Sequence, residues 1–185
     1  MKLENKKIGI FIESDFYENE IFYYNLRFPE EGAQVDFFSR LWGQDCLVFE
    51  GHEYKAKYYC NKSFEDCDPS DYDAIIVPAG MVSDRLRYSE DPNKLPPACE
   101  FLKKAFQDKN ILKGIICHGI WMVSPIAEVI KGRKVTVHNN CVSDAKNMGA
   151  VYVDQDVAVD EDLVTARTGG HCNFFAKKII QELSE

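Results

Sequence analysis

The stretch Gly114-Ile115-Ile116-Cys117-His118-Gly119 decides how the rest of this sequence is interpreted. It ends the apolar run 111–116, and a run of this kind is typical of a strand covered on both faces of a parallel sheet. A similar run at 74–77 ends at Pro78-Ala79-Gly80, and another at 7–12 leads into the polar stretch 13–20. Ligands bind at the carboxyl ends of strands in open α/β sheets, so residues directly after these runs are the candidates for a site.

Helical and strand patterns alternate along the rest of the chain. Apolar spacing predicts helices at 18–27, 94–107, 120–130, 142–148 and 172–183, with Pro29 ending the first before Gly32. Further strands are expected at 34–38, 134–137, 157–159 and 163–166, and residues 46–59 alternate like a hairpin that turns near Glu50-Gly51. This order predicts a doubly wound α/β fold, a mostly parallel sheet sandwiched by helices with a β-hairpin insert. No repeat or linker interrupts it, so we expect one domain over residues 1–185.

Composition narrows the possible partners. The 185 residues are 45% hydrophobic and 28% charged, which suits a compact domain with a sizeable core. The net charge of -8 repels a phosphate backbone and an anionic membrane, so we expect no nucleic-acid or membrane partner. The apolar stretch that ends at Glu13 is too short for a signal sequence or a membrane span, and a cytoplasmic location is expected.

Cysteine and histidine usage bears on metal and redox chemistry. The seven cysteines (46, 60, 67, 99, 117, 141 and 172) include no C-x-x-C pair and are expected to be free thiols. The four histidines (52, 118, 138 and 171) are scattered without ligand spacing. We therefore expect neither a metal site nor a cofactor.

Cys117 stands where a strand is expected to turn abruptly into a helix. Such a turn presents a nucleophile above the sheet, and Gly119 would relieve the crowding at the corner. The N-terminus of the helix favours negative charge, so it predicts a thiol pKa well below the usual ~8.5. The alternative is that Cys117 is one more small buried apolar residue at a strand end.

Several motifs together resemble the ThiJ/PfpI superfamily, whose fold is the flavodoxin-like one of the class I glutamine amidotransferases. They are the Ile-Cys-His-Gly turn, Phe16-Tyr17-Glu18-Asn19-Glu20, Val77-Pro78-Ala79-Gly80 and Gly132-Arg133-Lys134. The resemblance covers residues 7–183. Phe49-Glu50-Gly51 and Asp162-Leu163-Val164-Thr165 make the chain most similar to PfpI-type intracellular cysteine peptidases and glyoxalase III-like proteins.

The resemblance implies roles for individual residues. Cys117 is the nucleophile, and Glu20 is the carboxylic acid that hydrogen-bonds its sulfur, with a pKa raised by the like charge of the thiolate. His118 is the base, and Asp84, where the family usually has Glu, would complete a triad, often across a subunit interface. The backbone N–H groups of Gly80 and His118 would form an oxyanion hole. From the residues alone, Glu20 is interpreted as a solvated glutamate in the first turn of a helix, where its charge complements the helix dipole. Asp84 is interpreted in the same way as a helix N-cap.

The surroundings of the nucleophile depart from the family in places. Ala79 replaces the first glycine of its turn, and Trp121 stands where small or polar residues are common, so its ring is expected to narrow the pocket. His138 and His171 would line the pocket and exchange a proton near pH 7, or else serve as structural histidines.

The functional prediction is an enzyme in which Cys117 attacks a small carbonyl or peptide substrate, either a cysteine peptidase-like hydrolase or a glyoxalase III-type lyase. The alternative is a redox-sensing or stress-response protein, or chaperone, in which Cys117 is reversibly oxidised. A non-catalytic binding module is a third possibility. The resemblance further implies a homo-oligomer, a dimer or a hexamer.

Overall fold

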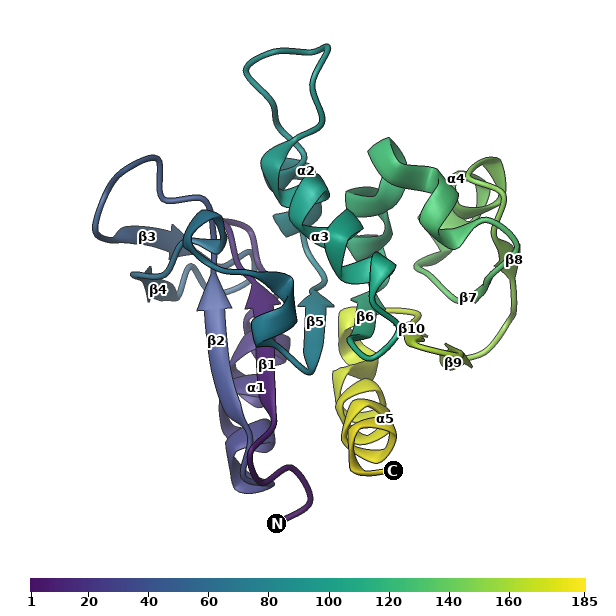
Figure 1. Ribbon diagram of the computed structural model, residues 1–185, viewed down its shortest axis with the longest axis horizontal. Helices are drawn as coiled ribbons and strands as arrows, with labels where there is room; N and C mark the ends of the chain where they lie inside the picture. The colour runs from purple at the N-terminus through teal and green to yellow at the C-terminus, as the bar shows by residue number, and fades with distance from the viewer.

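A six-stranded sheet forms the centre of the molecule in the computed structural model, which describes residues 1–185 (Figure 1). Its order is β2 (Gln34–Phe38), β1 (Lys7–Phe11), β5 (Ala74–Val77), β6 (Leu112–Ile116), β10 (Leu163–Ala166) and β9 (Val157–Asp160). The first five are parallel, and β9 runs antiparallel to β10 at the edge. The predicted α/β class with a mostly parallel sheet is confirmed.

Helices cover both faces of the sheet, which is why its central strands are continuous apolar runs. On one face α1 (Glu18–Glu30) packs beside α5 (Cys172–Ser184), and a Cβ at Gly114 would lie only 2.7 Å from the Phe175 ring. On the other face Phe101 of α3 (Pro97–Gln107) packs edge-on against Phe11, with ring centroids 5.8 Å apart. Figure 1 shows the α1–α5 pair and α3 on opposite sides.

Smaller elements surround the carboxyl end of the sheet. The hairpin insert consists of β3 (Leu47–Glu50) and β4 (Lys57–Cys60), joined by a six-residue loop, 51–56, that is longer than the predicted turn. The buried Glu18 carboxylate anchors this loop, because it accepts hydrogen bonds from the N–H groups of Glu53 (2.9 Å) and Tyr54 (2.7 Å). The remaining elements are α2 (Val82–Leu86), β7 (Lys134–Val135), α4 (Val142–Asn147) and β8 (Val151–Tyr152). No helix has the length and apolar character that a membrane span requires.

Two segments differ from the prediction at prolines. Helix α1 continues through Pro29 to Glu30 before the chain turns at Gly32, whose φ is +96°. Residues 117–130 form 3₁₀ turns, the segment η3 (Cys117–Ile130), instead of an α-helix, and Ile126 interrupts them with φ −128° and ψ 39°. Pro125 lacks an N–H and disfavours helical geometry in the residue before it, which accounts for a break at this point.

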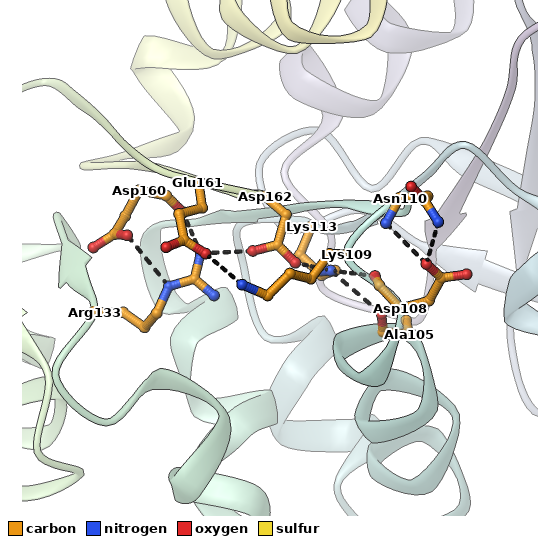
Figure 2. Close-up of polar contacts among 9 residues, drawn as sticks. All are labelled: Ala105, Asp108, Lys109, Asn110, Lys113, Arg133, Asp160, Glu161 and Asp162. Carbon is orange, nitrogen blue, oxygen red and sulfur yellow. Dashed lines mark hydrogen bonds and ion pairs between the residues drawn. The ribbon is translucent and has the colours of Figure 1, made fainter.

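A buried ion network holds the end of the sheet opposite Cys117 (Figure 2). The Lys113 side chain of β6 is fully buried, donates to the carbonyl of Asp108 at 2.9 Å and forms an ion pair with Asp162. Arg133 contacts the same carboxylate at 2.8 Å. Burial lowers the pKa of Lys113, and the ion pair with Asp162 opposes that shift. The only charged side chain inside β6 is thus paired, as a buried charge must be.

Candidate active site

Cys117 lies at the corner between β6 and η3 in a strained backbone conformation. Its φ is +61°, in the left-handed region that residues with a Cβ rarely adopt. Two residues on, a Cβ at Gly119 would lie 2.7 Å from the Val77 carbonyl oxygen and 3.0 Å from that of Pro78. The chain can therefore make this corner against β5 only with glycine at 119, which gives the geometry of a nucleophile elbow.

The Cys117 sulfur is nearly buried and close to an imidazole. Only 7% of Cys117 is exposed, and its Sγ lies 3.3 Å from Nδ1 of His118. Burial raises the pKa of the thiol to about 11, while the backbone N–H groups of Gly169, His118 and Gly80 favour the thiolate and oppose the rise. The expectation of a low thiol pKa is therefore wrong, because desolvation outweighs the stabilising N–H groups. The resting site holds a thiol at neutral pH.

Glu20 is fully buried in the first turn of α1. Its Oε2 accepts a hydrogen bond from the Ala79 N–H at 2.9 Å, whereas its Oε1 has no hydrogen-bond partner. Burial raises the pKa of Glu20 to about 8, so the carboxyl is mostly protonated at pH 7. The hydrogen bond from Glu20 to the sulfur that the resemblance implied is not present in this structure. Charge on Glu20 nevertheless contributes to the raised pKa of Cys117, as expected for neighbouring acidic groups.

A cavity of about 410 Å³ opens beside Cys117 at the carboxyl edge of the sheet. Six segments line it: Tyr17 after β1; His52 and Glu53 of the hairpin loop; Ala79, Gly80 and Met81 after β5; Cys117 and His118 after β6; His138 after β7; and Thr168, Gly169 and Gly170 after β10. The rings of His118 and His138 lie 4.6 Å apart, and burial, followed by the proximity of His138, lowers the pKa of His118. Cys117 thus has a neutral base beside it and room for a small substrate.

Three of the predicted site residues lie elsewhere. Asp84 is 43% exposed in its side chain and pairs with Arg87 at 2.7 Å, so it does not contact His118. The Trp121 ring meets the His118 ring edge-on at 4.9 Å, but its Nε1 donates to Asp144 at 3.0 Å and it does not line the cavity. His171 does not line the cavity; its Nδ1 lies 2.7 Å from Oγ1 of Thr168, which does.

Other predicted residues do come together, and the cavity adds some that were not predicted. Gly80 and His138 line the cavity with Cys117 and His118. Gly80 has φ +82°, and a Cβ there would lie 2.3 Å from the Asp15 carbonyl. The N–H of Gly169 joins those of Gly80 and His118 as a third group that favours negative charge on the sulfur. Sequence reasoning missed Thr168 and Gly169, although both directly follow β10, where the rule for open sheets places ligands.

The fold and site define a class of α/β proteins with a cysteine at a strand-to-helix elbow beside a small cavity. Residues 6–182 match the DJ-1/PfpI family, and the chain belongs to that family. It is 30% identical over 180 residues to "Protein/nucleic acid deglycase 2" of Escherichia coli (strain K12), covering 97% of this chain and 98% of the relative. It is 27% identical over 179 residues to "Putative cysteine protease YraA" of Bacillus subtilis (strain 168), covering 97% and 99%. The structure of Schizosaccharomyces pombe DJ-1 superposes with a TM-score of 0.80 at 21% identity, covering 95% of this chain and 90% of that one.

Proposed function

We propose that this protein is an enzyme that forms a covalent intermediate between Cys117 and a carbonyl carbon of its substrate. The observation that carries the proposal is the 3.3 Å contact between the Cys117 Sγ and His118 Nδ1 at a cavity wall that also presents backbone N–H groups. A nucleophile within reach of a base is the signature of covalent catalysis. The family relatives named as deglycases and as a cysteine protease are consistent with such chemistry.

The pKa values of the two groups define how the thiol would be activated. Because the pKa of Cys117 is about 11 and that of His118 is lowered, the resting pair is a thiol and a neutral imidazole. As the S–C bond forms, the S–H proton passes to His118 and the C=O π electrons move to oxygen. The N–H groups of Gly80, His118 and Gly169 supply hydrogen bonds to that oxygen. The attack and the proton transfer are therefore coupled.

The cavity favours a small carbonyl substrate over a peptide. Its volume of about 410 Å³ is that of a small-molecule site, and a small ligand fills it without the extended groove that a peptide occupies. With a 2-oxoaldehyde, attack gives a thiohemiacetal. Transfer of its C1 hydrogen, as a proton, to C2 gives the thioester of a hydroxy acid, and His118, which lines the cavity, exchanges the proton during that step. Water then releases the hydroxy acid and regenerates the thiol. No oxidant is consumed.

Turnover of methylglyoxal tests the proposal. Methylglyoxal consumption and lactate formation are measured for the wild type, Cys117→Ala, His118→Ala and the control Cys46→Ala, which removes an exposed thiol. We expect Cys117→Ala to abolish turnover and His118→Ala to reduce it by about 10²-fold or more, with the control unchanged. Turnover that survives in Cys117→Ala contradicts covalent catalysis at this residue.

The same experiment addresses the redox alternative. Peroxide oxidises thiolates, and a thiol with a pKa of about 11 is mostly protonated at neutral pH, which favours the enzyme over a sensor. If methylglyoxal is not consumed and mass spectrometry finds that dilute peroxide oxidises Cys117 ahead of the other six cysteines, the sensor is favoured instead.

A further inference from the structure

A carboxylate, an imidazole and a hydroxyl form a second polar chain that ends at Thr168. We propose that Thr168 takes the proton of the water that hydrolyses the Cys117 thioester, with His171 and Asp156 as positioning residues that receive and stabilise that proton. This inference rests on the proposed function. It applies equally to a thioester from a 2-oxoaldehyde and to an acyl-enzyme from a peptide, because water must attack the same bond in both.

One hydrogen bond and one ion-pair contact connect the three side chains. Oγ1 of Thr168 lies 2.7 Å from Nδ1 of His171, and Nε2 of the same ring lies 3.4 Å from Oδ1 of Asp156. A neutral imidazole carries its proton on one nitrogen, and the carboxylate favours the Nε2–H tautomer. Nδ1 then presents its lone pair to the hydroxyl, so Thr168 donates to His171 and its oxygen keeps its capacity as an acceptor.

The backbone of this region holds the three residues in place. The β9–β10 ladder ends with Val157 opposite Ala166, and one step further the Arg167 N–H donates to the Asp156 carbonyl at 3.0 Å. After Thr168 the chain makes a short 3₁₀ turn, η5 (Gly169–His171), in which the His171 N–H donates back to the Thr168 carbonyl at 2.8 Å. Arg167 Nε also lies 3.5 Å from Oδ1 of Asp156 and limits its movement.

The hydroxyl is placed on the same cavity as the nucleophile. Thr168 and Cys117 both line it, and the next residue, Gly169, supplies one of the N–H groups that favour the thiolate. His171 itself does not line the cavity and acts only through Thr168.

Hydrolysis needs an acid and a base at the same time, and His118 cannot be both. A sulfur whose pKa is raised to about 11 is a poor leaving group as a free thiolate, so His118, 3.3 Å away, is needed as the acid that protonates it. Another group must then deprotonate the water, and Thr168, which contacts His171, lines the same cavity.

The step balances without any added reagent. The water oxygen bonds to the thioester carbon, one water proton passes to Thr168 Oγ1, and the Thr168 proton passes to His171 Nδ1. The C–S bond breaks, and the sulfur takes a proton from His118, which is neutral once the thioester has formed and first takes that proton from solvent. His171 is left as an imidazolium beside Asp156 and returns its proton to solvent. The products are the carboxylic acid and the free thiol.

Acetylation with 4-nitrophenyl acetate tests the relay without knowledge of the natural substrate. The burst of 4-nitrophenolate reports acylation of Cys117, and the steady rate reports hydrolysis of the acetyl thioester. We expect Thr168→Val and His171→Asn to keep the burst rate within about twofold but lower the steady rate by about 10²-fold, the usual contribution of a general base. Intact mass spectrometry would then find acetyl-enzyme accumulating, and KM would fall together with kcat.

Conservative and control variants separate the relay from a packing effect. Thr168→Ser keeps the hydroxyl and is expected to stay within about threefold of the wild-type steady rate. Asp156→Asn is expected to slow hydrolysis. Asp154→Asn, which removes another carboxylate that pairs with Arg167 but does not contact His171, is expected to leave it unchanged.

The outcomes distinguish the two proposals. A wild-type protein without a burst, or a burst that persists in Cys117→Ala, contradicts the proposed function and the relay with it. A normal wild-type burst with an unchanged steady rate in Thr168→Val and His171→Asn overturns the relay alone. An equal fall of burst and steady rate in both variants also overturns it, because only packing around Cys117 would then have changed.

Discussion

Replacing Glu20 by Gln should change how the stability of the protein depends on pH. Burial raises the pKa of this carboxyl from its ordinary 4.5 to about 8 in the folded protein. Between these two values the folded state keeps a proton that the unfolded chain releases. Stability is therefore lost as the pH rises through this window, since the unfolded state binds fewer protons. Gln keeps the shape of the protonated acid and the carbonyl acceptor for Ala79, but it does not titrate.

The size of the effect follows from the two pKa values. Keeping Glu20 protonated costs the wild type about 1 kcal/mol at pH 5 and about 4 kcal/mol at pH 8, at ~1.4 kcal/mol per pH unit. The Gln variant does not bear this cost. The free energy of unfolding of Glu20→Gln, measured relative to that of the wild type, should therefore be about 3 kcal/mol higher at pH 8 than at pH 5.

Urea unfolding of both proteins at pH 5, 6, 7 and 8 measures this difference, because all other titrating groups are shared and cancel. Any stabilisation or destabilisation by the Gln amide itself does not depend on pH, so it shifts the difference in free energy of unfolding by the same amount at every pH and leaves the trend unchanged. A difference between the two proteins that is flat over this range, or that turns against the variant as the pH rises, would refute a raised pKa for Glu20.

Three further changes test other parts of the structure. Lys113→Met should lower the free energy of unfolding by about 3 kcal/mol in urea, since it leaves Asp162 buried without its main cation; a loss below about 1 kcal/mol would contradict this account. Gly119→Ala should destabilise the protein by about 1–3 kcal/mol, because its Cβ would meet backbone oxygen at 2.7 Å; unchanged thermal unfolding would argue against the tight corner. The rate of iodoacetamide alkylation of Cys117, followed by mass spectrometry, should still rise between pH 8 and pH 10, as a thiol pKa of about 11 requires; a plateau by pH 8 is the contrary result.

The central strands β1, β5 and β6 were predictable because each is a short, mostly apolar run. The strand expected at 134–137 is instead the two-residue β7, in a separate sheet with β8, which was not predicted. β5 and β6 follow directly from the runs before Pro78 and Cys117, since strands buried on both faces consist mostly of apolar residues; Lys113 in β6 is the exception and is paired with Asp162. The segment after Cys117 was harder. Most of its residues are apolar, with Ser124 and Glu128 exposed, so its composition indicates a largely buried segment but not whether it winds as an α- or a 3₁₀-helix, and Pro125 disfavours a regular α-helix.

The site was predictable to the extent that it depends on strand ends. Cys117, His118 and Gly80 are all fixed within three residues of a strand, and the rule for open sheets finds them. Asp84 lies further along, in α2, and Arg87 three residues later captures its carboxylate, a local pairing that competes with any distant partner. The thiol pKa was mispredicted because burial depends on what covers the sulfur, and no local pattern reports that.

The resting site is electrically neutral although the chain carries a net charge of -8. A buried thiolate beside a buried carboxylate would place two like charges in a poorly solvated corner, and proteins avoid that by protonating one or both. Here burial raises the pKa of both acids and lowers that of His118, so all three are uncharged at pH 7. Charge would therefore appear only when a carbonyl substrate arrives to accept the sulfur. In the mechanism proposed above, the strained cysteine stays buried as a thiol until the substrate arrives, and the substrate takes part in its activation.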